Sequence, residues 1–102
     1  MQNFKIIFTD TAENDLIGIV DYLSNFSYKI ADNYLNEIVE KIYSLEVMPE
    51  RFSFVMNEKL RQKGYHWMFI RNYTVFYVVD TAANEVHIRR ILYARREYTA
   101  LL

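Results

Sequence analysis

Three runs of β-branched and aromatic residues fill much of the second half of the chain, and only short turns separate them. The runs cover residues 65–71, 73–80 and 85–93. Connections this short join antiparallel neighbours, so we expect an antiparallel sheet. Side chains alternate between the two faces of a strand, and in the middle run both sets are apolar or aromatic. They are Thr74, Phe76 and Val78 on one face, and Val75, Tyr77 and Val79 on the other. A sheet of this kind needs cover on both faces.

The first half of the chain can cover one of these faces. Residues 4–8 form an apolar run that predicts a first strand. Asp10 and Glu13 then have the spacing of a capping box, which predicts the start of a helix. A second helix is expected over residues 28–47, up to the stop at Met48-Pro49. Two such helices form an antiparallel hairpin. Their apolar stripes are Ala12, Leu16, Ile19, Leu23 and Phe26, and then Ala31, Tyr34, Leu35, Ile38, Ile42 and Leu45.

These elements predict an α+β fold in the order β-α-α-β-β-β, with the helix hairpin packed on one face of a mainly antiparallel sheet. We expect one domain over residues 1–102, with a loop at residues 50–63 that can include one short strand. The second face of the sheet needs separate cover. Residues 97–102 can fold back on it as a short helix, but they are few, so we expect a partner protein there.

Composition excludes several kinds of site. The chain contains no cysteine, which rules out disulfides and thiolate metal sites. No signal peptide or long apolar span is visible, and we expect a cytoplasmic protein that does not enter the membrane. His66 and His87 have no acidic residue at ligand spacing, so we interpret them as structural or surface residues. No metal, cofactor, nucleophile triad or phosphate loop is predicted.

Charge is distributed unevenly along the chain. Residues 1–50 carry 3 Lys and 9 acids, a balance of 3 − 9 = −6, whereas residues 51–102 carry 9 Lys and Arg and 4 acids, a balance of 9 − 4 = +5. Guanidinium groups bind phosphates and carboxylates, and aromatic rings between them can stack on bases. The cationic end of the last strand is therefore a candidate binding site. Its members are Arg89, Arg90, Arg95 and Arg96, with Tyr93 between them and Tyr98 just after them. Strict alternation separates Arg89 from Arg90, so both line one site only if a bulge intervenes.

The residue pattern resembles the RelE/ParE family of toxins from type II toxin–antitoxin systems, which includes plasmid stabilisation proteins. The likeness covers nearly the whole chain. It rests on Phe8-Thr9 with Ala12, Glu13 and Asp15-Leu16, on Met48-Pro49, on Asn72-Tyr73 with Val75-Phe76-Tyr77, and on Ile91-Leu92-Tyr93 with Arg95-Arg96. The resemblance implies a cytoplasmic bacterial toxin held inactive in a hetero-oligomer by an antitoxin whose extended segment wraps it. RelE-like members cut mRNA in the ribosomal A site, whereas ParE-like members poison DNA gyrase.

The resemblance also implies a choice between these activities. RelE-like nucleases carry lysines near the positions of Trp67 and Phe69 and an arginine at that of Thr74, and Arg96 alone matches a basic residue of theirs. We therefore expect a ParE-like gyrase poison, although many ParE-like chains have His where Tyr93 stands. The expected target-binding residues are Arg61, Arg71, Arg89, Arg95, Arg96 and Tyr98.

Two other interpretations remain open. The first is a ribosome-dependent mRNA endonuclease with Arg96, Tyr93 and Arg90 as its catalytic residues, to which Arg61 and Arg71 could add cations. The second is a degenerate family member that is no longer toxic and acts only as a binding partner.

Overall fold

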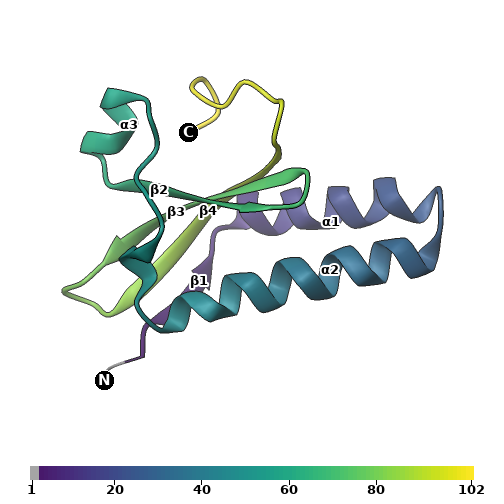
Figure 1. Ribbon diagram of the computed structural model, residues 1–102, viewed down its shortest axis with the longest axis horizontal. Helices are drawn as coiled ribbons and strands as arrows, with labels where there is room; N and C mark the ends of the chain where they lie inside the picture. Colours follow the sequence, from purple (N-terminus) through teal and green to yellow (C-terminus); the bar gives the residue numbers. More distant parts are fainter. Residues whose placement is uncertain (1–2) are drawn as a thin grey trace.

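The computed structural model describes residues 3–102 and has the predicted order of elements. Strand β1 (Lys5–Phe8) leads into helices α1 (Asp10–Ser24) and α2 (Tyr28–Tyr43), followed by two single 3₁₀ turns at Ser44–Glu46 and Pro49–Arg51. A short helix α3 (Glu58–Gln62) precedes strands β2 (Tyr65–Ile70), β3 (Tyr73–Asp80) and β4 (Glu85–Tyr93). Figure 1 shows the helix hairpin on one side of the sheet, and α3 and the C-terminal segment on the other.

The sheet has the order β1-β4-β3-β2 and is antiparallel except for one pair. Strands β2, β3 and β4 are joined as antiparallel neighbours, and β1 runs parallel to the first half of β4, from Lys5 beside Glu85 to Phe8 beside Ile88. The predicted α+β fold with a mainly antiparallel sheet is therefore confirmed. Among residues 3–102, no helix has the length and apolar character that crossing a membrane requires.

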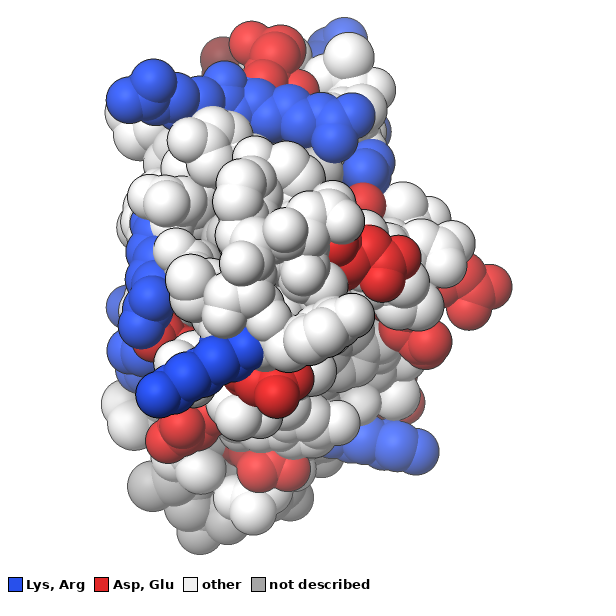
Figure 2. Space-filling view, turned by 90° about the vertical axis from the view of Figure 1, so that its right-hand side faces the viewer, with Lys and Arg blue, Asp and Glu red and all other residues white. Residues whose placement is uncertain are grey.

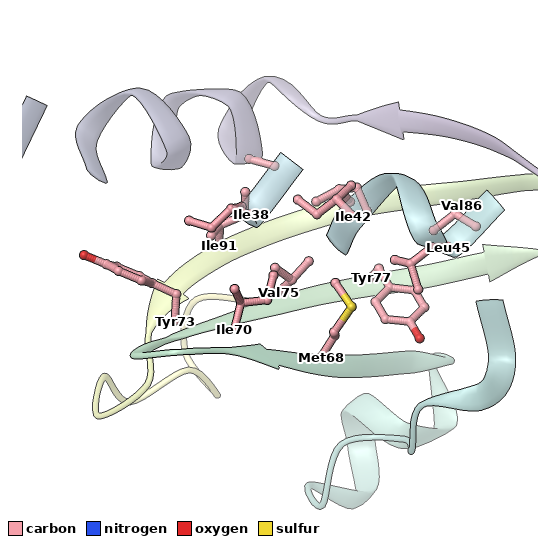
Figure 3. Packing of buried hydrophobic residues seen from close by; sticks show 12 residues of the cluster. Ile38, Ile42, Leu45, Met68, Ile70, Tyr73, Val75, Tyr77, Val86 and Ile91 are labelled. Atoms are coloured by element: carbon pink, nitrogen blue, oxygen red, sulfur yellow. The ribbon is translucent and has the colours of Figure 1, made fainter. Parts of the chain in front are cut away.

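The main core lies between the helix hairpin and the sheet. Figure 3 shows Ile38 and Ile42 of α2 facing Val75 and Ile91 of the sheet, all of them buried. Much of the two predicted apolar stripes supplies this packing, through Ala12, Leu16, Ile19, Tyr34, Ile38, Ile42 and Leu45. Phe26 is 68% exposed at the end of the hairpin, so its assignment to the stripe was wrong.

Helix α1 begins one residue earlier than the capping-box pattern predicts. The N-cap is Thr9, whose hydroxyl oxygen accepts a hydrogen bond from the Ala12 N–H at 3.1 Å, whereas Asp10 is the first helical residue. A threonine hydroxyl, like a carboxylate, can accept a hydrogen bond from one of the free N–H groups of the first turn. Helix α2 ends at Tyr43 rather than near Val47, and a 3₁₀ turn continues it.

The chain itself covers much of the second face of the sheet. Phe76 and Leu92 are buried there, in contact with a cluster that includes Val55 and Leu60 from the segment before β2 and Tyr98, Leu101 and Leu102 from the C-terminal end. The expectation that a partner covers this face was therefore wrong for most of it. The C-terminal residues do fold back, but as turns, and not as the short helix considered possible over residues 97–102.

A β-bulge at Arg89 determines which arginines of β4 share a face. Phe76 is opposite Arg90 while its neighbour Tyr77 is opposite Ile88, so Arg89 is the extra residue on β4. The bulge shifts the alternation by one position, and Arg90 and Leu92 then follow His87 and Arg89 on the second face. The separation of Arg89 from Arg90 by strict alternation is thus removed.

Candidate functional site

A groove of about 500 Å³ lies between α1 and the second half of β4. Strand β1 runs beside β4 only as far as Ile88, and the chain then turns into α1, so within residues 3–102 no strand neighbours β4 beyond that point on this side. The groove follows this uncovered edge. It is lined by Asn14, Asp15, Gly18, Ile19 and Tyr22 of α1, by Tyr73, Ile91, Leu92 and Tyr93 of the sheet, and by Arg96.

Asp15 closes one side of this edge and holds Arg90. Its carboxylate accepts hydrogen bonds from Arg90 Nε at 2.7 Å and Arg90 Nη2 at 3.0 Å, and also from the backbone N–H of Ile91 at 2.9 Å. Arg90 Nη1 donates to the Leu101 carbonyl at 3.2 Å. The hydrogen bonds to Asp15 raise the pKa of Arg90, so the guanidinium stays charged. This arrangement joins α1, β4 and the C-terminal segment.

Tyrosines form the floor and mouth of the groove. The Tyr73 ring meets the rings of Tyr34 and Tyr93 edge-on, with centroids 6.0 Å apart in both pairs. Burial, and then the neighbouring tyrosines, raise the pKa of Tyr73, so its hydroxyl remains neutral near pH 7. Tyr93 is about half exposed at the mouth. The groove thus offers tyrosine hydroxyl groups and ring faces to a ligand.

On the second face of the sheet, aromatic rings gather where β2 meets the C-terminal segment. Tyr98 lies 5.7 Å from the ring of Trp67 and 5.0 Å from that of Phe76, centroid to centroid. Phe69 lies 5.1 Å from Trp67 and is 60% exposed. Thr74 is buried on the same face. An exposed aromatic strip therefore remains along the β2 edge, and β2 contributes no cationic side chain to it.

The arginines of the C-terminal half have different surroundings. Arg71 is tied to the hairpin, with Nε 2.9 Å from Glu37 Oε1 and its guanidinium 4.7 Å from the centre of the Tyr34 ring. Arg89 lies over Tyr65 at 5.8 Å. Arg95 and Arg96 are exposed in the turn after β4. Figure 2 views the molecule from the end of the hairpin and shows basic side chains across its upper end and left side, with a broad uncharged area between them.

Comparison with known proteins identifies the family. The family model described as the ParE toxin of the type II toxin–antitoxin system parDE matches residues 6–98. The chain belongs to the ParE toxin family. It is therefore the toxin component of a type II toxin–antitoxin system, as the residue pattern indicated.

Two solved structures share the fold of this ParE-family toxin. The toxin–antitoxin complex RelBE2 from Mycobacterium tuberculosis matches at 22% identity with a TM-score of 0.68, over 91% of this chain and 93% of that chain. The chromosomal ParDE toxin–antitoxin system from P. aeruginosa matches at 20% identity with a TM-score of 0.73, over 90% of this chain and 97% of that chain. A comparison with curated protein sequences finds no match.

The ParE-family fold brings some of the predicted site residues together and separates others. Tyr93 and Arg96 line the groove, and Arg90 lies behind it on Asp15. Tyr98 packs on the other face of the sheet, and Arg61 lies on α3, exposed to solvent. The six residues expected to bind the target therefore do not form one surface.

The two histidines also differ in their surroundings. His66 is buried between the rings of Phe54 and Tyr77, and its Nδ1 lies 2.8 Å from the Phe52 carbonyl oxygen, which is a structural role. His87 is half-buried, and its Nε2 lies 3.0 Å from Glu85 Oε1. The expectation that neither histidine has an acidic neighbour was wrong, because residues two apart on a strand share a face.

Sequence reasoning missed several residues that build the groove. Asp15 was recognised only as part of the family pattern, and Gly18, Tyr22 and Tyr73 were not predicted to lie near one another. The one signal available was Gly18 itself, since glycine inside a helical pattern costs stability and often has a packing or functional reason.

Proposed function

We propose that this ParE-family toxin arrests growth by poisoning DNA gyrase, and that it acts in the cytoplasm, where a cognate antitoxin neutralises it in a hetero-oligomer. The antitoxin proposal draws on the family and on the two structural relatives, which are toxin–antitoxin complexes. The choice of gyrase rests on a single feature of this chain, the side chains that line the β2 edge of the second face of its sheet.

The β2 edge of the second face lacks the cations that the resemblance places there for cleavage of RNA. Attack by the 2′-hydroxyl on the scissile phosphate needs positioned positive groups, each contributing roughly 3 kcal/mol to lowering the barrier. Trp67 and Phe69 hold the positions at which the resemblance places lysines, and both belong to the aromatic strip. Thr74, at the expected arginine position, is buried. This face is therefore suited to contact with a protein surface.

One observation favours the alternative of a ribosome-dependent mRNA endonuclease. Tyr93 and Arg96 line the same groove, so a phosphate there could meet both side chains. The third residue of that site, Arg90, has Nε, Nη1 and Nη2 occupied by Asp15 and Leu101, which leaves it little capacity for a substrate phosphate. The groove is therefore better suited to a peptide than to RNA.

We place the antitoxin in this groove. An uncovered strand edge can receive an extended segment of a partner, and the tyrosines offer ring faces to its side chains. Gly18 supports this placement. A Cβ at Gly18 would meet no atom within 4 Å, so the chain's own packing does not require glycine there. Glycine is less favourable than alanine inside a helix by about 1 kcal/mol, and close approach of a partner explains its presence.

The deciding experiment is a supercoiling assay with purified gyrase, titrated with this chain alone and with its antitoxin. We expect loss of supercoiling or trapped DNA breaks, relieved when the antitoxin is added. In parallel, mRNA from cells that express the chain should show no new cleavage sites. If growth stops while gyrase is unaffected and mRNA is cut, the endonuclease is the correct function, and Arg96→Ala and Tyr93→Phe should abolish cutting. Normal growth would indicate a non-toxic binding partner.

A further inference from the structure

The hairpin that joins β3 to β4 brings two carboxylates and an imidazole together at one point. Asp80 and Glu85 are directly opposite each other in the strand register. His87 lies two residues further along β4, on the same face as Glu85. The side-chain ligand atoms of the three residues all lie within 4.8 Å of one another. Asp80 and His87 also line a hollow of about 430 Å³, so the cluster is open to solution.

The pairing of Asp80 with Glu85 is electrostatically unfavourable without a cation. Like charges directly opposite each other on neighbouring strands destabilise a sheet. Among residues 3–102, no Lys or Arg forms an ion pair with either carboxylate. Arg89 lines the same hollow, but its guanidinium lies over the Tyr65 ring. Lys5 is beside Glu85 in the register and likewise makes no ion pair with it.

Among residues 3–102, the one side chain paired with either carboxylate is His87, whose Nε2 is 3.0 Å from Glu85 Oε1. His87 offsets the negative charge of these carboxylates only when its ring is protonated. The neutral ring instead presents a nitrogen lone pair beside two carboxylates, and that is a set of metal ligands.

We propose that Asp80, Glu85 and His87 bind a divalent transition-metal cation, with Zn²⁺ as the reference ion. One imidazole with carboxylates suits Zn²⁺ and its neighbours in the first transition row better than Mg²⁺ or Ca²⁺, which prefer oxygen ligands alone. The Ala83 N–H donates to Asp80 Oδ1 at 3.0 Å, which fixes this carboxylate and leaves Oδ2 for the metal. The bound cation neutralises the Asp80–Glu85 pair and ties β3 to β4.

This site is separate from the groove, because it lies at the opposite end of β4 from Tyr93. Metal binding therefore acts on the stability of the hairpin and is independent of which target the toxin poisons.

The test uses the purified full chain, from which a chelator has removed bound metal. The chain is titrated in a calorimeter with ZnCl₂ at pH 7.5, and separately with MgCl₂ for comparison. We expect one Zn²⁺ per chain and no comparable binding of Mg²⁺. At a hundredfold excess over the dissociation constant, Zn²⁺ should raise the melting temperature by roughly 10 °C. The variant His87→Gln should weaken Zn²⁺ binding by at least about tenfold, and Glu40→Gln, an exposed acid on α2, should not change it.

A second variant, Asp80→Asn, tests the site through its effect on the melting temperature as well as on Zn²⁺ binding. Its amide oxygen can still accept the Ala83 N–H, so the turn is kept while the charge is removed. Without metal this variant should melt at a higher temperature than the parent chain, because the like-charge pair is gone, and Zn²⁺ should no longer stabilise it. Zn²⁺ binding that is absent from the parent chain, or that is equal in the parent, His87→Gln and Asp80→Asn, would overturn the proposal.

Discussion

Arg90 of β4 and Asp15 of α1 are joined by two hydrogen bonds, of 2.7 and 3.0 Å, between side chains that are only 16% and 13% exposed. The same carboxylate accepts the backbone N–H of Ile91 at the edge of β4 that β1 leaves uncovered. One acidic side chain therefore satisfies one N–H of this edge, attaches the first helix to the sheet and fixes the most buried arginine of the cationic end.

Removing this carboxylate should destabilise the chain strongly. Asp15→Ala leaves a guanidinium and a backbone N–H without partners in a largely buried place, and we expect a loss of about 2–3 kcal/mol in the free energy of unfolding. Urea denaturation measures it. The matched control is Glu37→Ala, which breaks the exposed Arg71–Glu37 pair and should have a much smaller effect, because solvent screens that pair. Equal losses in the two variants would contradict the role given to Asp15.

A second prediction concerns Tyr77, which is fully buried and donates its hydroxyl to the Pro49 carbonyl at 2.7 Å. Tyr77→Phe keeps the ring and leaves that carbonyl without its partner, so a loss of about 1–3 kcal/mol in unfolding free energy is expected. Burial raises the pKa of Tyr77 well above its ordinary value, so spectrophotometric titration should show one tyrosine that ionises only when the protein unfolds. Tyr28→Phe, at an exposed ring, is the control and should leave stability unchanged.

A third prediction concerns the pH at which the Glu97 carboxylate is protonated. Hydrogen bonds from the Thr99 side chain and backbone N–H lower the pKa of Glu97 from its ordinary value of 4.5. Because the pKa of Glu97 is lower in the folded than in the unfolded chain, its ionised carboxylate stabilises the fold at pH values above the ordinary pKa. This stabilisation is lost as the pH falls through the folded-state pKa. In an NMR titration Thr99→Val should move the Glu97 pKa back toward 4.5. An unchanged pKa would show that the turn does not hold this carboxylate.

The strands and the helix hairpin could be predicted from sequence because their signals are periodic and repeated. Residues 73–80 alternate over the full length of β3, and Ile38, Ile42 and Leu45 recur at helical spacing on and just beyond α2. Helix α3 was not predicted, because its sequence shows no periodic pattern of apolar residues. Helix α3 has 5 residues, too few for a stripe, and its one local signal is the Asn57 cap, whose side chain accepts from the Leu60 N–H.

The site could be predicted less well, because it depends on which strands pair and in what register. Asp15 and Arg90 are 75 positions apart in the chain, and only the parallel pairing of β1 with β4 brings them together. The bulge at Arg89 has no local sequence signature, although it decides which arginines share a face. The role of Arg51 likewise depends on the folded path of the backbone after α2. Its guanidinium donates to the carbonyls of Ser44, Val47 and Met48, so it terminates the segment after α2.

A fourth prediction tests the placement of the antitoxin. Gly18→Ala should raise the free energy of unfolding by roughly 0.5–1 kcal/mol, since the helix gains propensity and no atom blocks the new methyl group. Gly18→Trp should leave the chain folded and toxic but fill the groove, so that the antitoxin no longer restores growth or binds in calorimetry. Ile17→Trp is the matched control, because Ile17 is 58% exposed on the same helix and does not line the groove. If Gly18→Trp is neutralised like the parent chain, the antitoxin binds elsewhere.

The last prediction concerns the contact with gyrase. Of the arginines near the end of β4, Arg90 is held by Asp15 and Arg89 lies over Tyr65, whereas Arg95 and Arg96 are exposed in the turn that follows. The pair Arg95→Ala and Arg96→Ala should change unfolding free energy by no more than about 0.5 kcal/mol, as is usual for surface positions. Inhibition of supercoiling should fall at least about tenfold, because rim charges set the rate of encounter with a partner, and the loss should be larger at low salt. Lys59→Ala with Arg61→Ala on α3 removes the same charge from the other end of the second face. If this second pair weakens inhibition and the first does not, the gyrase contact lies over α3 and not at the turn after β4.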